Sequence, residues 1–163
     1  MGIDKKRRLL LQGRNLNENV IRMPWVKKGI AFTDMCTRCE KCVDVCPSSI
    51  LQVADGGFPE IDFSFGECFF CSHCISCCSV DLFDLEQDNP WTVKATISTS
   101  CLNNQTTYCR SCAESCGSEA LLFEFSTSIF VSPIVANDTC TGCGACISNC
   151  PVEAISMKAD VSF

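Results

Sequence analysis

Cysteine is the residue of this sequence with the most scope for chemistry. Seventeen of the 163 residues are cysteine. Two stretches, 36–47 and 140–151, share one spacing: three cysteines separated by two residues each, a fourth after three more, and then a proline. Three thiolates on so tightly wound a loop can bind three irons of one 4Fe–4S cubane, while the fourth is placed to ligate a neighbouring cluster. The spacing therefore predicts iron–sulfur ligation.

Sixteen of the cysteines form four such sets, and only Cys77 is left over. If the fourth cysteine of each set crosses to the other cluster of its pair, each cluster takes three ligands from one loop and one from another. We thus predict four 4Fe–4S clusters, with the ligands Cys36, Cys39, Cys42 and Cys78; Cys68, Cys71, Cys74 and Cys46; Cys101, Cys109, Cys112 and Cys150; and Cys140, Cys143, Cys146 and Cys116.

Other kinds of site fit the sequence less well. Zinc prefers two C-x2-C pairs separated by a longer loop, which does not explain a third cysteine at the same step. With one histidine, His73, there is little scope for a hydrolase arrangement, and no glycine-rich nucleotide loop is present. We predict that the protein is not an enzyme, and that His73 donates a hydrogen bond near a cluster instead of ligating it.

Departures from the repeated spacing single out two places. Proline is replaced by Ser79 and Gly117 after the second and third sets, and the third set has seven residues between Cys101 and Cys109. We expect that longer gap to loosen its loop and make its cluster more labile, and it leaves open whether Cys101 is a ligand. Cys77 is either a packed or free thiol, or an alternative ligand used in cluster assembly or exchange.

The cysteine sets also organise the chain. They form two pairs, separated by the polar stretch at 86–91, and in each pair two β-prone runs lie between the cysteine loops: 50–53 and 58–63, then 121–125 and 130–135. The first two runs flank Asp55-Gly56-Gly57, a strong hairpin signal. We predict an α+β fold of two tandem two-cluster ferredoxin-like units with short helices and small β-hairpins, at 31–90 and 91–163, after a basic arm at 1–30.

Charge is distributed unevenly between that arm and the body. Residues 1–28 hold eight basic and two acidic side chains, a balance of +6, which leaves −12 for the remainder of a chain with a net charge of −6. Such an arm could bind nucleic acid, an anionic membrane surface or an acidic protein, or it could fold back on its own body. Without interleaved aromatic residues, we do not expect nucleic-acid binding.

The compartment follows from the same N-terminal stretch. Arg7 and Arg8 precede an apolar run that stops at Gln12, too short for an export signal. The sequence has no apolar run long enough for a membrane span. We therefore expect a cytoplasmic protein with no membrane span. In the cytoplasm, cysteine clusters usually bind metal.

The chain resembles a known family beyond the common cysteine spacing. The stretches IDKKRRLLLQGR, IRMPW and CLNNQTTYCRSCAESC are similar to those of NapF-type ferredoxins. The resemblance implies a cytoplasmic protein that interacts with the precursor of the periplasmic nitrate reductase catalytic subunit and aids its maturation by cofactor or iron–sulfur loading. Electron transfer between a reductase and an acceptor enzyme is the alternative, and a structural scaffold whose clusters never change redox state is a third.

Overall fold

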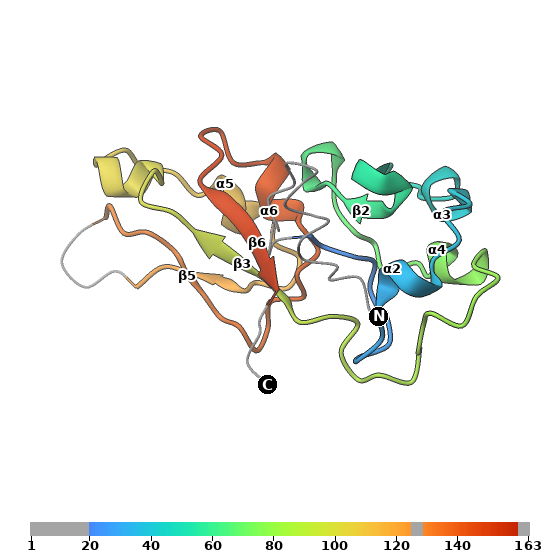
Figure 1. Cartoon of the computed structure of the whole chain (residues 1–163). Coiled ribbons are helices and arrows are strands. Elements are labelled where there is room, and N and C mark those ends of the chain that lie inside the picture. The colour runs from blue at the N-terminus through green and yellow to red at the C-terminus, as the bar shows by residue number, and fades with distance from the viewer. Residues whose placement is uncertain (1–19, 125–128, 160–163) are drawn as a thin grey trace, which may run out of the picture.

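A computed structural model describes residues 20–124 and 129–159 of the chain. Its elements are short, and they fall into two groups that lie beside each other (Figure 1). The first group comprises α2 (Phe32–Met35), α3 (Lys41–Asp44), β1 (Leu51–Val53), η1 (Asp55–Gly57), β2 (Pro59–Ile61), η2 (Phe63–Phe65) and α4 (His73–Ser76). The second comprises β3 (Val93–Ile97), η3 (Leu102–Gln105), α5 (Ser111–Glu114), β4 (Leu121–Leu122), β5 (Ile134–Val135), α6 (Ala145–Ser148) and β6 (Ile155–Ala159). The chain is thus α+β, with one-turn helices and small antiparallel sheets.

Antiparallel strand pairs lie between the cysteine loops in both units, but those of the second unit are shorter than the predicted runs at 121–125 and 130–135, and residue 125 lies outside the described residues. β1 pairs antiparallel with β2, with Leu51 opposite Ile61, and β4 pairs with β5, with Leu121 opposite Val135. The first hairpin turns through Gly56 and Gly57, whose φ values of 79° and 75° are accessible to glycine without steric cost. The sequence signal for a hairpin at these glycines is therefore confirmed.

A third sheet, which no hairpin signal in the sequence predicts, closes the second unit. β3 and β6 pair antiparallel over five residues, with Ala95 opposite Met157. Val93, Ala95, Ile155 and Met157 are all less than 9% exposed, so one face of this sheet belongs to the core. The two strands are about sixty residues apart in the chain, and local periodicity cannot reveal a pairing over that distance.

The first unit has a shorter counterpart of the β3–β6 pairing. Val26 forms a single antiparallel bridge with Phe83, flanked by hydrogen bonds from Lys27 N–H to the Leu82 carbonyl and from Asp84 N–H to the Trp25 carbonyl. Met23 is only 4% exposed. The described part of the predicted arm, from residue 20 to residue 30, therefore packs against the first unit. Residues 1–19 of that arm lie outside the described residues.

The two units meet through three kinds of contact. The Cys68 N–H donates to the Cys143 carbonyl (2.8 Å), and the Phe70 ring of the first unit lies edge-on to the Trp91 ring of the second, with centroids 5.6 Å apart. Phe63 packs on Gly144 so closely that a Cβ there would lie 2.0 Å from the Phe63 Cδ1 atom. The absence of a side chain at Gly144 is what allows η2 and α6 to touch.

No helix within the described ranges is long and apolar enough to cross a membrane.

The contact between the units predicts a clear difference between two neighbouring phenylalanines of η2. Phe63 is 4% exposed and Phe65 is 60% exposed. Phe63→Ala should lower the free energy of unfolding by about 3–5 kcal/mol, because it leaves a cavity against Gly144. Phe65→Ala is the matched control, with an expected change of about 0.5 kcal/mol or less. Anaerobic denaturant titrations measure both, and equal losses would contradict the contact.

Candidate metal centres

Four cavities gather the predicted ligand cysteines, and each cavity is named here after the first cysteine of its loop. The Cys68 cavity is lined by Cys46, Cys68, Cys71 and Cys74 and has an empty volume of about 400 Å³. The Cys101 cavity is lined by Cys101, Cys109, Cys112 and Cys150 and measures about 350 Å³. The Cys140 cavity is lined by Cys116, Cys140, Cys143 and Cys146 and measures about 310 Å³. Each combines three cysteines of one loop with one from another.

The Cys36 cavity has an empty volume of about 380 Å³ and is lined by more cysteines than the other three. It is lined by Cys36, Cys39, Cys42 and Cys78, and also by Cys74 and Cys77. Cys74 lies between this cavity and the Cys68 cavity, since it lines both. The structure therefore brings each of the four predicted ligand sets to one cavity. In residues 20–124 and 129–159, no three His, Cys, Asp or Glu side chains meet as closely as ligands of a single metal ion.

Three of the four loops reach this geometry through the same backbone conformation. The residues on either side of the middle cysteine have positive φ in each: Arg38 and Glu40, Phe70 and Ser72, and Gly142 and Gly144. Alternation of left- and right-handed residues turns successive N–H groups to one side of the chain, which makes a concave, electropositive surface. Such a surface suits the anionic sulfur of a cluster.

The left-handed residues place N–H donors on the sulfur atoms. Arg38 N–H donates to the Cys36 Sγ atom at 3.4 Å. The corresponding N–H of Lys41 lowers the pKa of the exposed Cys39 thiol. Hydrogen bonds to cluster sulfur are one of the levers by which a protein sets reduction potential.

Each fourth cysteine directly follows a one-turn helix. The helices α3, α4, α5 and α6 end two residues before Cys46, Cys78, Cys116 and Cys150, respectively. The turn carries this cysteine away from its own loop and toward the other cavity of its unit. This is the structural basis of the crossing that the sequence spacing predicts.

Serine and backbone donors contact two of these crossing cysteines. The Cys116 Sγ atom accepts from Ala120 N–H (3.3 Å) and lies 3.5 Å from the Ser118 hydroxyl. Burial raises the pKa of Cys116, but these donors outweigh it, so the net pKa is lowered. Cys46 has the same balance of burial against donors, led by the Ser48 hydroxyl at 3.7 Å. Ser48 and Ser118 were not predicted from the sequence, although each stands two residues after a fourth cysteine.

The third cysteine of every loop has the opposite shift. Burial is the main cause, and neighbouring thiols add to it in several of the sites. The raised pKa values are about 11 for Cys42 and Cys112 and about 12 for Cys74 and Cys146. These thiols hold their protons at neutral pH and must release them when they bind iron.

The long gap between Cys101 and Cys109 is folded rather than loose. It contains η3, and Asn103 within it is 3% exposed. The Asn103 side chain donates to the Cys109 carbonyl (2.8 Å) and accepts from the Cys109 N–H (3.2 Å). This two-way bridge holds Cys101 beside Cys109 at one cavity. The expected lability of this site stays a prediction, but the hydrogen bonds of Asn103 give its loop a defined structure.

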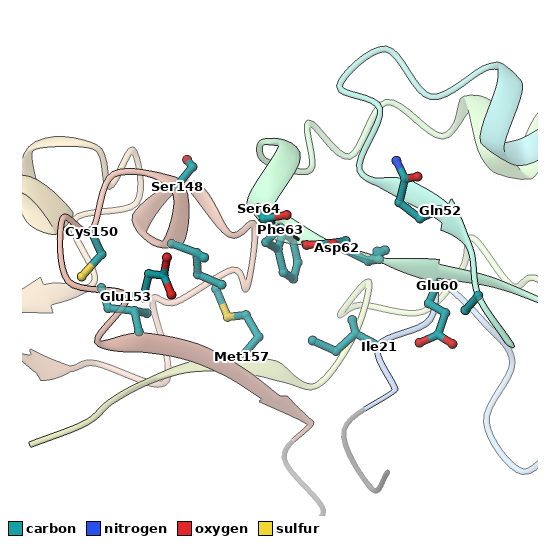
Figure 2. Close-up of a pocket in the computed structure, with 14 residues that line it drawn as sticks. Ile21, Gln52, Glu60, Asp62, Phe63, Ser64, Ser148, Cys150, Glu153 and Met157 are labelled. Carbon is teal, nitrogen blue, oxygen red and sulfur yellow. Dashed lines mark hydrogen bonds between the residues drawn. The ribbon is translucent and has the colours of Figure 1, made fainter. Parts of the chain in front are cut away.

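A separate cleft lies between the two units and reaches Cys150 (Figure 2). Its walls include Ile21, Phe63 and Met157, with the carboxylates of Glu60 and Glu153 at its sides (Figure 2). Its empty volume is about 1380 Å³, part of it open to solvent. It contains only one of the predicted ligands, so the cysteine chemistry lies outside it.

Comparison with known proteins identifies the family. A model of the 4Fe-4S binding domain matches residues 31–52 and 133–156. The chain is 39% identical over 159 residues to the ferredoxin-type protein NapF of Escherichia coli (strain K12), with 97% of each chain covered. The chain belongs to the NapF ferredoxin-type proteins. It carries 4Fe–4S binding domains, as the cysteine spacing predicts.

Two further relatives show the breadth of the similarity. NapF of Haemophilus influenzae is 42% identical over 138 residues, covering 85% of this chain and 78% of the relative. The methylamine utilization ferredoxin-type protein MauM of Methylorubrum extorquens is 32% identical over 147 residues, covering 78% and 66%. The NapF similarity thus extends well beyond the two short domain matches.

The Asn103 bridge of this NapF-type chain yields a prediction for the Cys101 cavity. Asn103→Ala leaves the Cys109 N–H and carbonyl without their partner, at a cost of about 1–3 kcal/mol. We expect faster loss of iron to a chelator from this cavity than from the others. Asn104→Ala is the control, because Asn104 is exposed. Equal iron-release kinetics for the two variants, followed anaerobically by visible absorption, would refute the bridge.

The raised thiol pKa values predict how iron retention depends on pH. Protons compete with iron for Cys42, Cys74, Cys112 and Cys146, whose pKa values lie above the ordinary 9.0. Iron retention should therefore increase as the pH rises from about 7 to 9, because less free energy is needed to remove the protons. Equilibration with a chelator at fixed pH, followed by iron analysis, measures this. A retention curve that is flat or falls with pH would contradict it.

Proposed function

We propose that the protein holds four 4Fe–4S clusters in the four crossed cysteine sets. The observation that carries this proposal is that each set lines one cavity, three thiols from one loop and one from another. The donor set fits the group, because 4Fe–4S clusters take four thiolate ligands. When bound, such clusters supply one-electron chemistry. The cysteines hold them, and the N–H groups of the loops stabilise their negative charge.

We further propose that the protein is a cytoplasmic accessory protein of a periplasmic nitrate reductase system. It would bind the precursor of the catalytic subunit before export and assist its cofactor or iron–sulfur loading. Support comes from the near full-length similarity to NapF. Cys39 and Cys71 are exposed members of their cavities, so a partner can approach these two sites directly. The units at 31–90 and 91–163 would be two two-cluster domains, with the basic residues of 1–30 as the contact region.

Electron transfer between a reductase and an acceptor enzyme is the alternative function. The relative MauM is named for methylamine utilization, so chains similar to this one are not confined to a single system. Cysteine-ligated clusters on an acidic body suit either function. The two functions differ in what happens to the iron.

The iron content of this chain and of its partner, measured before and after mixing, distinguishes these functions. Cluster-loaded protein is mixed with the nitrate reductase catalytic subunit lacking its cluster, without added reductant. Maturation by cluster transfer predicts that iron leaves this chain and appears in the subunit. Constant iron content over many turnovers of a coupled reductase assay would instead establish electron transfer. Co-purification of the precursor with the full chain and with a chain lacking residues 1–19, which keeps Met23 and Val26, tests the contact region, and binding without those residues would disprove a contact there.

The crossed ligation has its own test in Cys46. This residue follows the first cysteine loop in sequence but lines the Cys68 cavity. Cys46→Ser should therefore damage the cluster of Cys68, Cys71 and Cys74 while sparing that of Cys36, Cys39 and Cys42. Combining Cys46→Ser with Cys71→Ser, of the same cavity, should cost little more iron than either change alone. Combination with Cys39→Ser should remove about eight irons, two clusters of four. The reverse result would indicate uncrossed ligation.

A further inference from the structure

Cys77 is the one cysteine outside the four predicted ligand sets, yet the structure places it in a cavity with one of them. It lines the Cys36 cavity together with Cys36, Cys39, Cys42 and Cys78. Cys74 also reaches this wall, but it lines the Cys68 cavity as well, where its own set lies. The Cys36 cavity therefore has one thiol more than its cluster needs. Among the described residues, each of the other three cavities is lined by four cysteines.

The other loops show what ordinarily occupies the position of Cys77. The helices α3, α4, α5 and α6 are each followed by a residue in the right-handed region and then by the fourth cysteine. These residues are Val45 (φ −91°), Cys77 (φ −86°), Ser115 (φ −89°) and Asn149 (φ −93°). The four positions are structurally equivalent. A thiol occurs at only one of them.

Cavity contact separates Cys77 from its three equivalents. In the described part of the chain, Val45 does not line the Cys68 cavity, Ser115 does not line the Cys140 cavity, and Asn149 does not line the Cys101 cavity. Cys77 alone among the four reaches the cavity of the cysteine that follows it.

A purely structural role for Cys77 would be to close the end of α4. Its Sγ atom lies 3.4 Å from the Cys74 carbonyl, and the Ser115 hydroxyl donates to the equivalent Cys112 carbonyl at 3.1 Å. Serine can thus make this bond without lining a cavity. Substitution of Cys77 by serine preserves the bond and removes only the thiol, so the two roles can be separated experimentally.

We propose that Cys77 is a second ligand position for the cluster of the Cys36 cavity, able to replace Cys78 on the same iron. The Cys77 thiol gives its proton to solvent as its sulfur binds iron, and the Cys78 thiolate takes up a proton as its bond to iron breaks. No electron is transferred, and the cluster keeps four thiolate ligands.

The proposal rests on the four-cluster assignment and narrows the function built on it. A partner that takes a cluster must replace its ligands one at a time, and a spare thiol keeps the cluster bound while another ligand leaves. The Cys36 cavity also contains Cys39, which is exposed. These two features make the Cys36 cavity the site from which a cluster is passed on.

Iron analysis of serine variants tests the proposal in the full-length, anaerobically purified protein. Cys78→Ser should keep the iron content of the unsubstituted protein, because Cys77 takes the vacant position. The double variant Cys77→Ser/Cys78→Ser should lose about four iron atoms per chain. Cys150→Ser is the matched control, since its cavity has no fifth thiol, and it should lose about four iron atoms by itself.

Two outcomes would overturn the proposal. In one, Cys78→Ser loses as much iron as the double variant, so Cys77 cannot replace Cys78. In the other, the double variant keeps its iron, so some other group is the ligand. The unsubstituted protein's iron content checks the four-cluster assignment first, and none of these measurements needs the nitrate reductase partner. Failure of the inference is therefore distinguishable from failure of the proposed function.

Alkylation of the unsubstituted, cluster-loaded protein supplies a second measurement if the variants fail to fold. Iodoacetamide labels thiols that are not bound to iron, and fragment mass spectra separate Cys77 from Cys78. Two interchangeable ligands predict label divided between both residues. Label confined to Cys77 would show a free thiol beside a fixed ligand and would overturn the proposal.

Discussion

The arrangement of the thiols depends on a backbone constraint in the cysteine loops. Three cysteines spaced by two residues can face one cavity when the residues beside the middle cysteine adopt positive φ. Glycine does so at little cost, as at Gly142 and Gly144, but Arg38, Glu40, Phe70 and Ser72 also adopt this conformation. Each non-glycine residue there costs about 1–2 kcal/mol. Interactions of the loop with a bound cluster would offset part of that cost and so couple loading to folding.

The short elements of the fold follow from the same dependence. Helices of one turn and strands of two to five residues have little stability of their own. The cysteines compensate by being part of the interior: Cys140 and Cys146 belong to the buried core, and several others pack against it. A small chain with inorganic centres at its core needs less apolar surface than one without them.

The two units are a repeat, but their differences are local and physical. The second unit closes with the β3–β6 sheet where the first has a single bridge at Val26. The third loop lacks the left-handed residue of the other loops at Arg110, whose φ is −137°, and uses the buried Asn103 bridge instead. Phe63 and Gly144 then join the units, and this contact depends on the absence of a side chain at Gly144.

The sequence by itself determined the cofactor class, the sixteen candidate ligands, their crossed grouping and the two hairpins, because spacing and turn residues act over a few positions. Only the tertiary structure decided the β3–β6 pairing, the packing of residues 20–30 on the first unit, the Asn103 bridge and the place of Cys77 in a ligand cavity. Each of these depends on which distant segments, or which side of a helical turn, come together in space. The local spacing of residues carries no information on which segments meet, since backbone direction and packing determine those contacts.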